Sequence, residues 1–278
     1  MSSAEPFHTA VPEILSRPDG TTIAYHKTAG DKTGKLAPGL VFLGGFMSDM
    51  TGTKALALES HARGAGLDFL RFDYLGHGAS SGRFEDGTIG RWAEDAVAVL
   101  DALTEGPQIL IGSSMGGWIM LLAALARPER IAGLVGVAAA PDFTETLMWQ
   151  KFSPEIQATM AREGVYHEPS EYSVEPYAIT MELIVEGRNH LLMGAPIPIS
   201  CPVRLIHGSA DADVPCKLSL DLMGRLTSSD VEVILVKGGG HRLSEPTDLT
   251  RLTATLAALS APSCRYAGIS GCTPGSPA

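Results

Sequence analysis

The chain has 278 residues, of which 45% are hydrophobic and 19% charged, and its formal net charge is -10. This composition is too apolar for a disordered chain, and the basic residues form no run, so we expect neither a nucleic-acid partner nor binding to anionic membranes. Every apolar stretch is shorter than a membrane span of ~18 residues, and the start lacks a secretory signal, which predicts a cytoplasmic protein without a transmembrane segment.

Strand-like and helix-like segments alternate over most of the chain. A hairpin is predicted around the turn Pro18-Asp19-Gly20, between residues 11–17 and 21–27. The segments that follow alternate between strand and helix up to the strand 131–138, and the alternation resumes with the strand 203–206. They are 39–43, 53–64, 67–72, 88–103, 108–111, 115–127, 131–138, 203–206, 217–226, 231–236 and 248–259. This order predicts an α/β fold with a mostly parallel sheet of about eight strands and helices on both faces.

Residues 141–200 interrupt the alternation after the sixth predicted strand. Their composition is mixed and helical, with helix candidates at 154–163 and 176–186, and the segment is too long for a plain connection. We therefore expect a core of residues 1–140 and 201–261 with an inserted helical cap. Residues 262–278, rich in Ser, Gly and Pro, are expected to form a disordered tail. The cap residues expected to line an apolar acyl pocket are Met148, Trp149, Phe152, Met160 and Met181.

A nucleophile motif follows the predicted strand 108–111. Gly112-Ser113-Ser114-Met115-Gly116 matches G-x-S-x-G and lies between a strand and a helix, where a strained turn exposes the serine. Residues 78–82 spell the same pattern around Ser80, but they form a polar loop at which no helix begins. We therefore predict Ser114 as the nucleophile, with a capping serine in a glycine-rich turn as the alternative.

A serine nucleophile needs a base to take its proton and a carboxylate to orient that base. Asp211 follows the predicted strand 203–206, and His241 follows three glycines after the predicted strand 231–236. Both are therefore expected at the carboxyl edge of the sheet, where open α/β sheets place their sites. In chain order these residues are Ser114, Asp211 and His241, which is one of the orders known for Ser-His-Asp catalytic triads.

Other acids and histidines compete for these roles. Asp213 is two residues beyond Asp211, and Asp142 follows another predicted strand, so both stay open as the acid. His207, at a strand end, is expected to be structural and to bond a backbone carbonyl. His77 is expected to order the loop that contains it.

Acyl transfer also needs donors for the oxyanion. One is expected to be the backbone N–H of Met115, and the other that of Phe46, within Gly44-Gly45-Phe46-Met47 after the strand 39–43. The alternative is that these glycines form only a tight turn. Neither a metal nor an organic cofactor is expected. The four cysteines contain no CxxC pair and are interpreted as reduced thiols: Cys201, Cys216, Cys264 and Cys272.

Three features resemble those of the α/β-hydrolase superfamily: the G-x-S-x-G turn at Ser114, the triad order and the motif Asp73-x-x-Gly-x-Gly-x-Ser80. The resemblance extends over the chain up to about residue 261. A closer resemblance is to the mitochondrial palmitoyl-protein thioesterases of the abhydrolase-domain family, which also cleave acyl glucuronides. It is carried by residues 45–50, 108–118, 126–129, 164–166, 169–172, 196–208 and 231–235. By position, that family's nucleophile, acid and base fall on Ser114, Asp211 and His241. No organelle-targeting leader is recognised, which keeps the expected location cytoplasmic.

The resemblance and the motifs together predict a serine hydrolase that cleaves carboxylic esters or thioesters through an acyl-enzyme. Its expected substrate is an acylated small molecule or an acylated protein, and the sequence specifies no oligomeric state. Two alternatives stay open because fold and triad do not fix the substrate. One is peptide, lactone or C–C hydrolysis by the same triad, and the other is a non-enzymatic binding module, which would not need all three residues.

Overall fold

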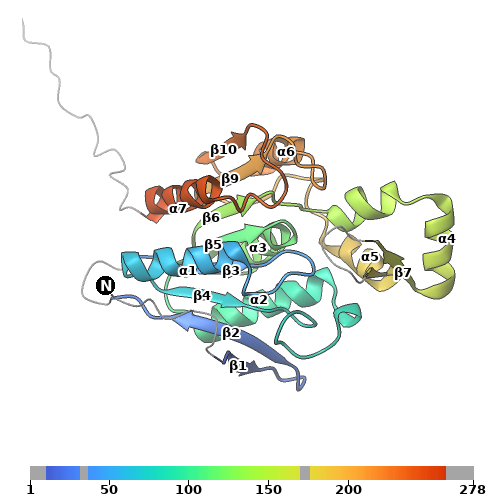
Figure 1. Cartoon of the computed structure of the whole chain (residues 1–278), viewed down its shortest axis with the longest axis horizontal. Coiled ribbons are helices and arrows are strands. Elements are labelled where there is room, and N and C mark those ends of the chain that lie inside the picture. Colours follow the sequence, from blue (N-terminus) through green and yellow to red (C-terminus); the bar gives the residue numbers. More distant parts are fainter. Residues whose placement is uncertain (1–10, 32–36, 170–175, 261–278) are drawn as a thin grey trace, which may run out of the picture.

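The computed structural model describes residues 11–31, 37–169 and 176–260. Within them, eight strands form one sheet in the order β1-β2-β4-β3-β5-β6-β9-β10 (Figure 1). The strands are β1 (Glu13–Ser16), β2 (Thr22–Thr28), β3 (Gly39–Leu43), β4 (Phe69–Phe72), β5 (Gln108–Ser113), β6 (Ile131–Val137), β9 (Val203–Gly208) and β10 (Val231–Val236). β2 pairs antiparallel with β1 and β4, and all other pairs are parallel. The predicted α/β fold with a mostly parallel sheet is confirmed, whereas the predicted tail lies outside the described residues.

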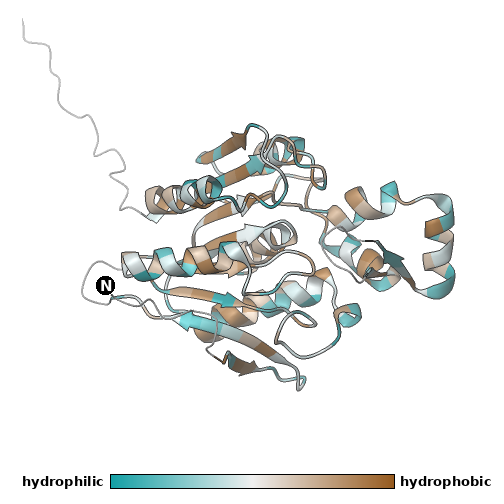
Figure 2. Ribbon diagram, viewed as in Figure 1, coloured by the Kyte–Doolittle hydropathy of each residue, from teal (hydrophilic) through white to brown (hydrophobic). Residues whose placement is uncertain are grey.

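Helices cover both faces of this sheet because its central strands bury both sets of side chains. In β3, Val41 and Leu43 belong to one buried cluster, and Leu40 and Phe42 belong to the other. The first cluster includes side chains from α2 (Ile89–Leu103), α3 (Met115–Ala126) and α6 (Lys217–Arg225). The second includes side chains from α1 (Thr53–Ala65) and α7 (Pro246–Ser260). The central strands are accordingly hydrophobic in Figure 2.

The segment between β6 and β9 packs at the end of the sheet to which β6 leads (Figure 1). It contains a π-helical turn (Thr144–Met148), α4 (Pro154–Glu163), β7 (Val165–Glu168), β8 (Tyr177–Thr180) and α5 (Met181–Gly187). The prediction of one helix over 176–186 is wrong in its first half, because β8 pairs antiparallel with β7 there. Thr180 ends this strand and caps α5 by accepting a hydrogen bond from Leu183 N–H.

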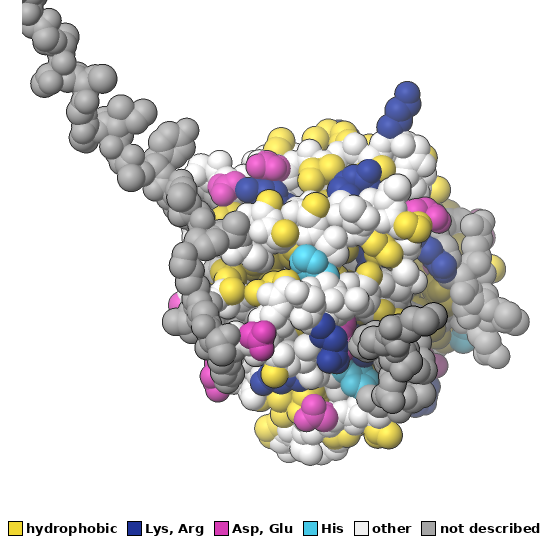
Figure 3. All heavy atoms as spheres, turned by 60° about the vertical axis from the view of Figure 1, so that its left-hand side comes forward, with side chains coloured by type: hydrophobic (Ala, Val, Ile, Leu, Met, Phe, Trp, Pro, Cys, Tyr) yellow, Lys and Arg dark blue, Asp and Glu magenta, His cyan; other side chains and the backbone are white. Residues whose placement is uncertain are grey.

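The surface carries charges of both signs. On the face drawn in Figure 3, acidic and basic side chains are interspersed and form no single patch. Among the described residues, no helix is both long and apolar enough to cross a membrane.

Candidate active site

The turn between β5 and α3 holds Ser114 in a strained backbone conformation. Its φ of 54° and ψ of -119° place a non-glycine residue in a region that L-residues rarely adopt. Chain packing requires glycine on both sides of it. A Cβ on Gly112 would lie 2.3 Å from the carbonyl oxygen of Gly116, and a Cβ on Gly116 would lie 2.1 Å from that of Leu43. The G-x-S-x-G spacing therefore reflects a close approach of backbones.

Other residues with a strained backbone lie at the same edge of the sheet as Ser114. The non-glycine residues with positive φ, among those that the structure describes, are Met47, Ser114, Ala138, Asp142 and Leu243. They lie in the segments that follow β3, β5, β6 and β10. Strained backbone of this kind is typical of functional sites, because the surrounding structure must hold it in place.

Ser114, His241 and Asp211 form a continuous hydrogen-bonded chain. His241 Nε2 lies 3.1 Å from Ser114 Oγ, and His241 Nδ1 lies 2.8 Å from Asp211 Oδ2. The Asp211 side chain is fully buried, whereas that of His241 is 18% exposed. The structure thus brings the predicted nucleophile, base and acid together from the ends of β5, β10 and β9.

The Asp211 carboxylate is held in its ionised form. Burial by itself raises the pKa, but hydrogen bonds from His207, His241 and the backbone N–H of Val214 outweigh it, so the pKa lies well below its ordinary value. Oδ1 accepts from the backbone N–H groups of Asp213 and Val214 at 3.0 and 2.9 Å. An ionised, fixed carboxylate is suited to orient an imidazole and to stabilise its protonated form.

His207 contacts this carboxylate from the other side, a contact that sequence reasoning missed. Its buried ring has Nε2 at 3.1 Å from Asp211 Oδ2 and 2.9 Å from the carbonyl oxygen of Val214. Because both partners are acceptors, we assign the proton to Nε2, and Nδ1 accepts from Ser219 Oγ at 2.7 Å. The expected bond to a backbone carbonyl is present, and the ring also supports the acid.

The competing candidates have other partners. Asp142 is buried and accepts from the backbone N–H groups of Leu192 and Met193 at 2.8 and 2.9 Å, which ties the segment before β9 to the end of β6. Ser80 Oγ donates to the carbonyl of Asp73 and accepts from the backbone N–H of Ala24. Neither side chain contacts His241 in the described structure.

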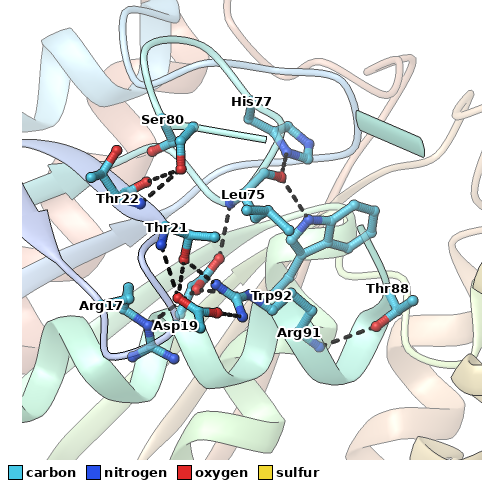
Figure 4. Close-up of polar contacts among 12 residues, drawn as sticks. Arg17, Asp19, Thr21, Thr22, Leu75, His77, Ser80, Thr88, Arg91 and Trp92 are labelled. Atoms are coloured by element: carbon cyan, nitrogen blue, oxygen red, sulfur yellow. Dashed lines mark hydrogen bonds and ion pairs between the residues drawn. The ribbon is translucent and has the colours of Figure 1, made fainter. Parts of the chain in front are cut away.

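His77 orders its loop, as expected. Its Nδ1 lies 3.2 Å from the carbonyl oxygen of Leu75, which also accepts from Trp92 Nε1 at 3.1 Å (Figure 4). The imidazole packs edge-on against Tyr74, Phe84 and Trp92. Burial among these rings lowers the pKa of His77 to about 4, so it is neutral at pH 7.

Phe46 and Met115, the predicted oxyanion donors, both line the pocket that contains Ser114. Within the described part of the chain, neither backbone N–H donates to another protein group. The Phe46 ring packs edge-on against four rings from other parts of the chain: Phe84, Trp92, Phe143 and Tyr177. Sequence reasoning missed this cluster, which fixes the loop that presents the Phe46 amide.

The pocket has a volume of about 750 Å³. Its apolar lining includes Phe46, Phe143, Leu147, Met148 and Tyr177. Its polar lining includes Ser48, Asp49, Lys54, Asp213, Arg242 and Ser244. Of the five cap residues expected here, only Met148 lines the described pocket. Met160 is buried in the hydrophobic core, and the other three are partly buried against that core: Trp149, Phe152 and Met181.

Asp211, Asp213 and His241 bring ligand atoms within 4.8 Å of one another, the spacing of a metal site. However, both oxygens of Asp211 accept two hydrogen bonds each, and His241 Nδ1 is engaged with one of them. These bonds use the lone pairs that a metal would need. The cluster therefore fits a proton-transfer triad better than a metal site.

Comparison with known proteins identifies the family of the chain. The family model of the alpha/beta hydrolase fold matches residues 41–178. The chain is 42% identical over 250 residues to palmitoyl-protein thioesterase ABHD10, mitochondrial, of Bos taurus, a match that covers 90% of this chain and 80% of that protein. Among solved structures, mouse alpha/beta hydrolase domain-containing protein 10 is 40% identical with a TM-score of 0.82, covering 90% of this chain and 98% of that one. A putative hydrolase from Agrobacterium vitis is 40% identical with a TM-score of 0.85, covering 92% and 100%.

These relatives overturn the predicted cytoplasmic location, because the bovine and human proteins are named as mitochondrial. That prediction rested on the lengths of the apolar stretches and on the composition of the first residues, of which residues 1–10 lie outside the described structure. Composition there is a weaker guide to location than similarity over most of the chain.

The predicted resemblance, in contrast, is confirmed by the identity and coverage of the match. The chain belongs to the α/β-hydrolase family, in the group that contains palmitoyl-protein thioesterase ABHD10.

Proposed function

We propose that the protein is a serine hydrolase that cleaves carboxylic thioesters and esters, with Ser114 as nucleophile, His241 as base and Asp211 as acid. The observation that carries this proposal is the chain of contacts from Ser114 Oγ through the His241 ring to Asp211, at 3.1 and 2.8 Å, inside a pocket. Similarity to thioesterases of the same family supports the choice of bond.

In the first step, Ser114 Oγ attacks the substrate carbonyl carbon while His241 Nε2 takes the hydroxyl proton. The N–H groups of Phe46 and Met115 stabilise the negative charge that develops on the carbonyl oxygen. The tetrahedral intermediate collapses when His241 returns the proton to the leaving thiol or alcohol. The acyl group is then bound to Ser114 as an ester.

In the second step, water attacks the acyl-enzyme, and His241 takes a proton from that water. Collapse of the second intermediate releases the carboxylic acid and returns the proton to Ser114 Oγ. Asp211 orients the imidazole throughout and stabilises its protonated form. The acids, bases and donors of this cycle are all groups of the chain itself.

Residues 141–200 act as a cap in this proposal, and the substrate is an acylated small molecule or an acylated protein. The cap contributes Phe143, Leu147, Met148 and Tyr177 to the pocket. Their aromatic and flexible side chains suit the burial of an acyl chain beside Ser114.

The test is the hydrolysis of matched p-nitrophenyl esters and acyl thioesters of increasing chain length. We expect turnover by the wild type, loss of about 10³-fold or more in Ser114→Ala, and a preference for longer thioesters. Ser80→Ala is the matched control, because it removes the serine of the second G-x-S-x-G motif. It is expected to keep turnover while unfolding at a lower temperature, since it loses two hydrogen bonds. Activity that survives in Ser114→Ala refutes the nucleophile.

A further inference from the structure

Lys54 is the second residue of α1, a place that is unfavourable for a cation. The N-terminus of a helix carries a partial positive charge. The first turn of α1 has no acidic residue, and its N-cap, Gly52, offers no side-chain acceptor. Lys54 is also half-buried and lines the pocket that contains Ser114. An ammonium in this place must gain from its partners what it loses in solvation.

Those partners belong to the loop that carries His241. Lys54 Nζ donates to the carbonyl oxygen of Arg242 at 2.5 Å and lies 3.3 Å from Ser244 Oγ. Ser244 Oγ donates to the same carbonyl at 3.0 Å. Arg242 directly follows His241, so this bond joins α1 to the residue beside the proposed base.

The loop needs support at this point. It reaches His241 through Gly238-Gly239-Gly240, residues that restrict the backbone least. Before His241, the backbone is tied to the segment after β9, because Ala210 N–H donates to the carbonyl of Gly239. Beyond His241, Leu243 takes a strained φ of 43° and buries its side chain. Lys54 holds the loop between these two anchors, from the side of α1.

We propose that Lys54 is a positioning residue for catalysis: its ammonium binds the carbonyl of Arg242 and thereby holds His241 Nε2 against Ser114 Oγ. This inference rests on the proposed function of Ser114 and His241. It assigns Lys54 no contact with the substrate, although the residue lines the pocket.

The positioning depends on the charge of Lys54, because charged donors form stronger hydrogen bonds than neutral ones. Burial, and to a smaller extent Arg242, lowers the pKa of Lys54 to about 8, while Asp248 acts in the opposite direction. Asp248 is itself paired with Arg251 on α7. The other titratable side chains of the pocket are Asp49, Glu168, Tyr177, Asp213, His241 and Arg242. The ammonium is present below pH 8 and is lost as the pH rises through that value, so activity should fall there.

The test compares Lys54→Met, which removes the charge, with Lys54→Arg, which keeps a charged donor. Lys217→Met is the matched control, because Lys217 is exposed on α6 and pairs with Asp221. Two readouts are measured: the rate at which a fluorophosphonate labels Ser114, and kcat and KM for a short p-nitrophenyl ester. In Lys54→Met, we expect labelling and kcat to fall about tenfold to a hundredfold with KM unchanged. Lys54→Arg should recover part of the loss, and Lys217→Met should match the wild type.

The pH profile and stability separate positioning from a merely structural role. The wild type should lose kcat as the pH rises through about 8, and Lys54→Met should lack this descending limb. Equal labelling of Lys54→Met and wild type overturns the proposal, as does a rise in KM with kcat unchanged, which would make Lys54 a substrate contact. If Lys54→Met does not fold, Ser244→Ala gives the same readouts with a smaller expected loss. A wild type that the probe does not label refutes the proposed function itself, which distinguishes the two failures.

Discussion

Replacing Asp211 by asparagine should reverse the hydrogen-bonding direction of the proposed base. Two backbone N–H groups point at Oδ1, at 3.0 and 2.9 Å, and cannot change their donor character. The amide oxygen of Asn must therefore take the place of Oδ1, which leaves its NH2 facing His207 and His241. An NH2 group donates, so His241 must accept at Nδ1 and carry its proton on Nε2. That nitrogen then cannot take the proton of Ser114.

The expected loss in kcat/KM is about 10³–10⁴-fold, the size known for a triad locked in the wrong tautomer. The assay is hydrolysis of a p-nitrophenyl ester with Ser114→Ala as the floor, and the tautomer of His241 is followed by nitrogen NMR of labelled histidine. Asp213→Asn is the matched control for the alternative acid and should stay within about threefold of wild type. An Asp211→Asn variant with a tenth or more of wild-type activity refutes the assignment, as does an equal loss in Asp213→Asn.

Three other substitutions test the supports of the site. Asp142→Ala leaves the N–H groups of Leu192 and Met193 without an acceptor, which should lower the free energy of unfolding by about 2–4 kcal/mol in urea titrations. Burial keeps His77 neutral and lowers its pKa from 6.5 to about 4. Its contribution to the free energy of unfolding is therefore full above pH 6.5 and is lost as the pH falls to about 4. Over that range, the free energy of unfolding should fall by about 3 kcal/mol more in the wild type than in His77→Gln. Phe46→Ala keeps its backbone N–H but loses four ring contacts, so kcat should fall about tenfold with little change in KM.

The core of the fold was predictable because local sequence and tertiary structure agree there. Residues 39–43 alternate their side chains between two apolar clusters and form a strand with the predicted bounds. Residues 231–236 also form a strand with the predicted bounds. The segment between β6 and β9 was harder to predict, because β7 and β8 have only four residues each and pair with each other rather than with the main sheet. A signal was nevertheless present: Thr180 is a good N-cap residue, and its position marks where β8 ends and α5 begins.

In the candidate site, too, some residues could be predicted from the sequence and others could not. Ser114, Asp211 and His241 follow strands and are surrounded by glycine or polar loop residues, so sequence position alone suggested them. The supporting residues had no such signal. The sequence places His207 at the end of a strand and Lys54 in a helix, but it does not reveal the contacts of His207 with Asp211 or of Lys54 with Arg242.

Buried or half-buried side chains of charged residues contact the loops around the candidate site, and two of them, Asp95 of α2 and Lys54 of α1, lie on helices. Loop backbone has no neighbouring strand to satisfy its N–H and C=O groups, so another partner must do so. Carboxylates with little or no exposed surface accept backbone N–H groups from such loops: Asp73 from Met50 and Ala79, Asp95 from Leu75, Asp142 from Leu192 and Met193, and Asp211 from Asp213 and Val214. Lys54 does the same for a carbonyl. The apolar alternation of the strands accounts for the sheet, whereas the positions of the proposed reacting groups depend on these polar contacts. Neutral substitutions at such residues should therefore reduce activity more than they reduce the content of secondary structure.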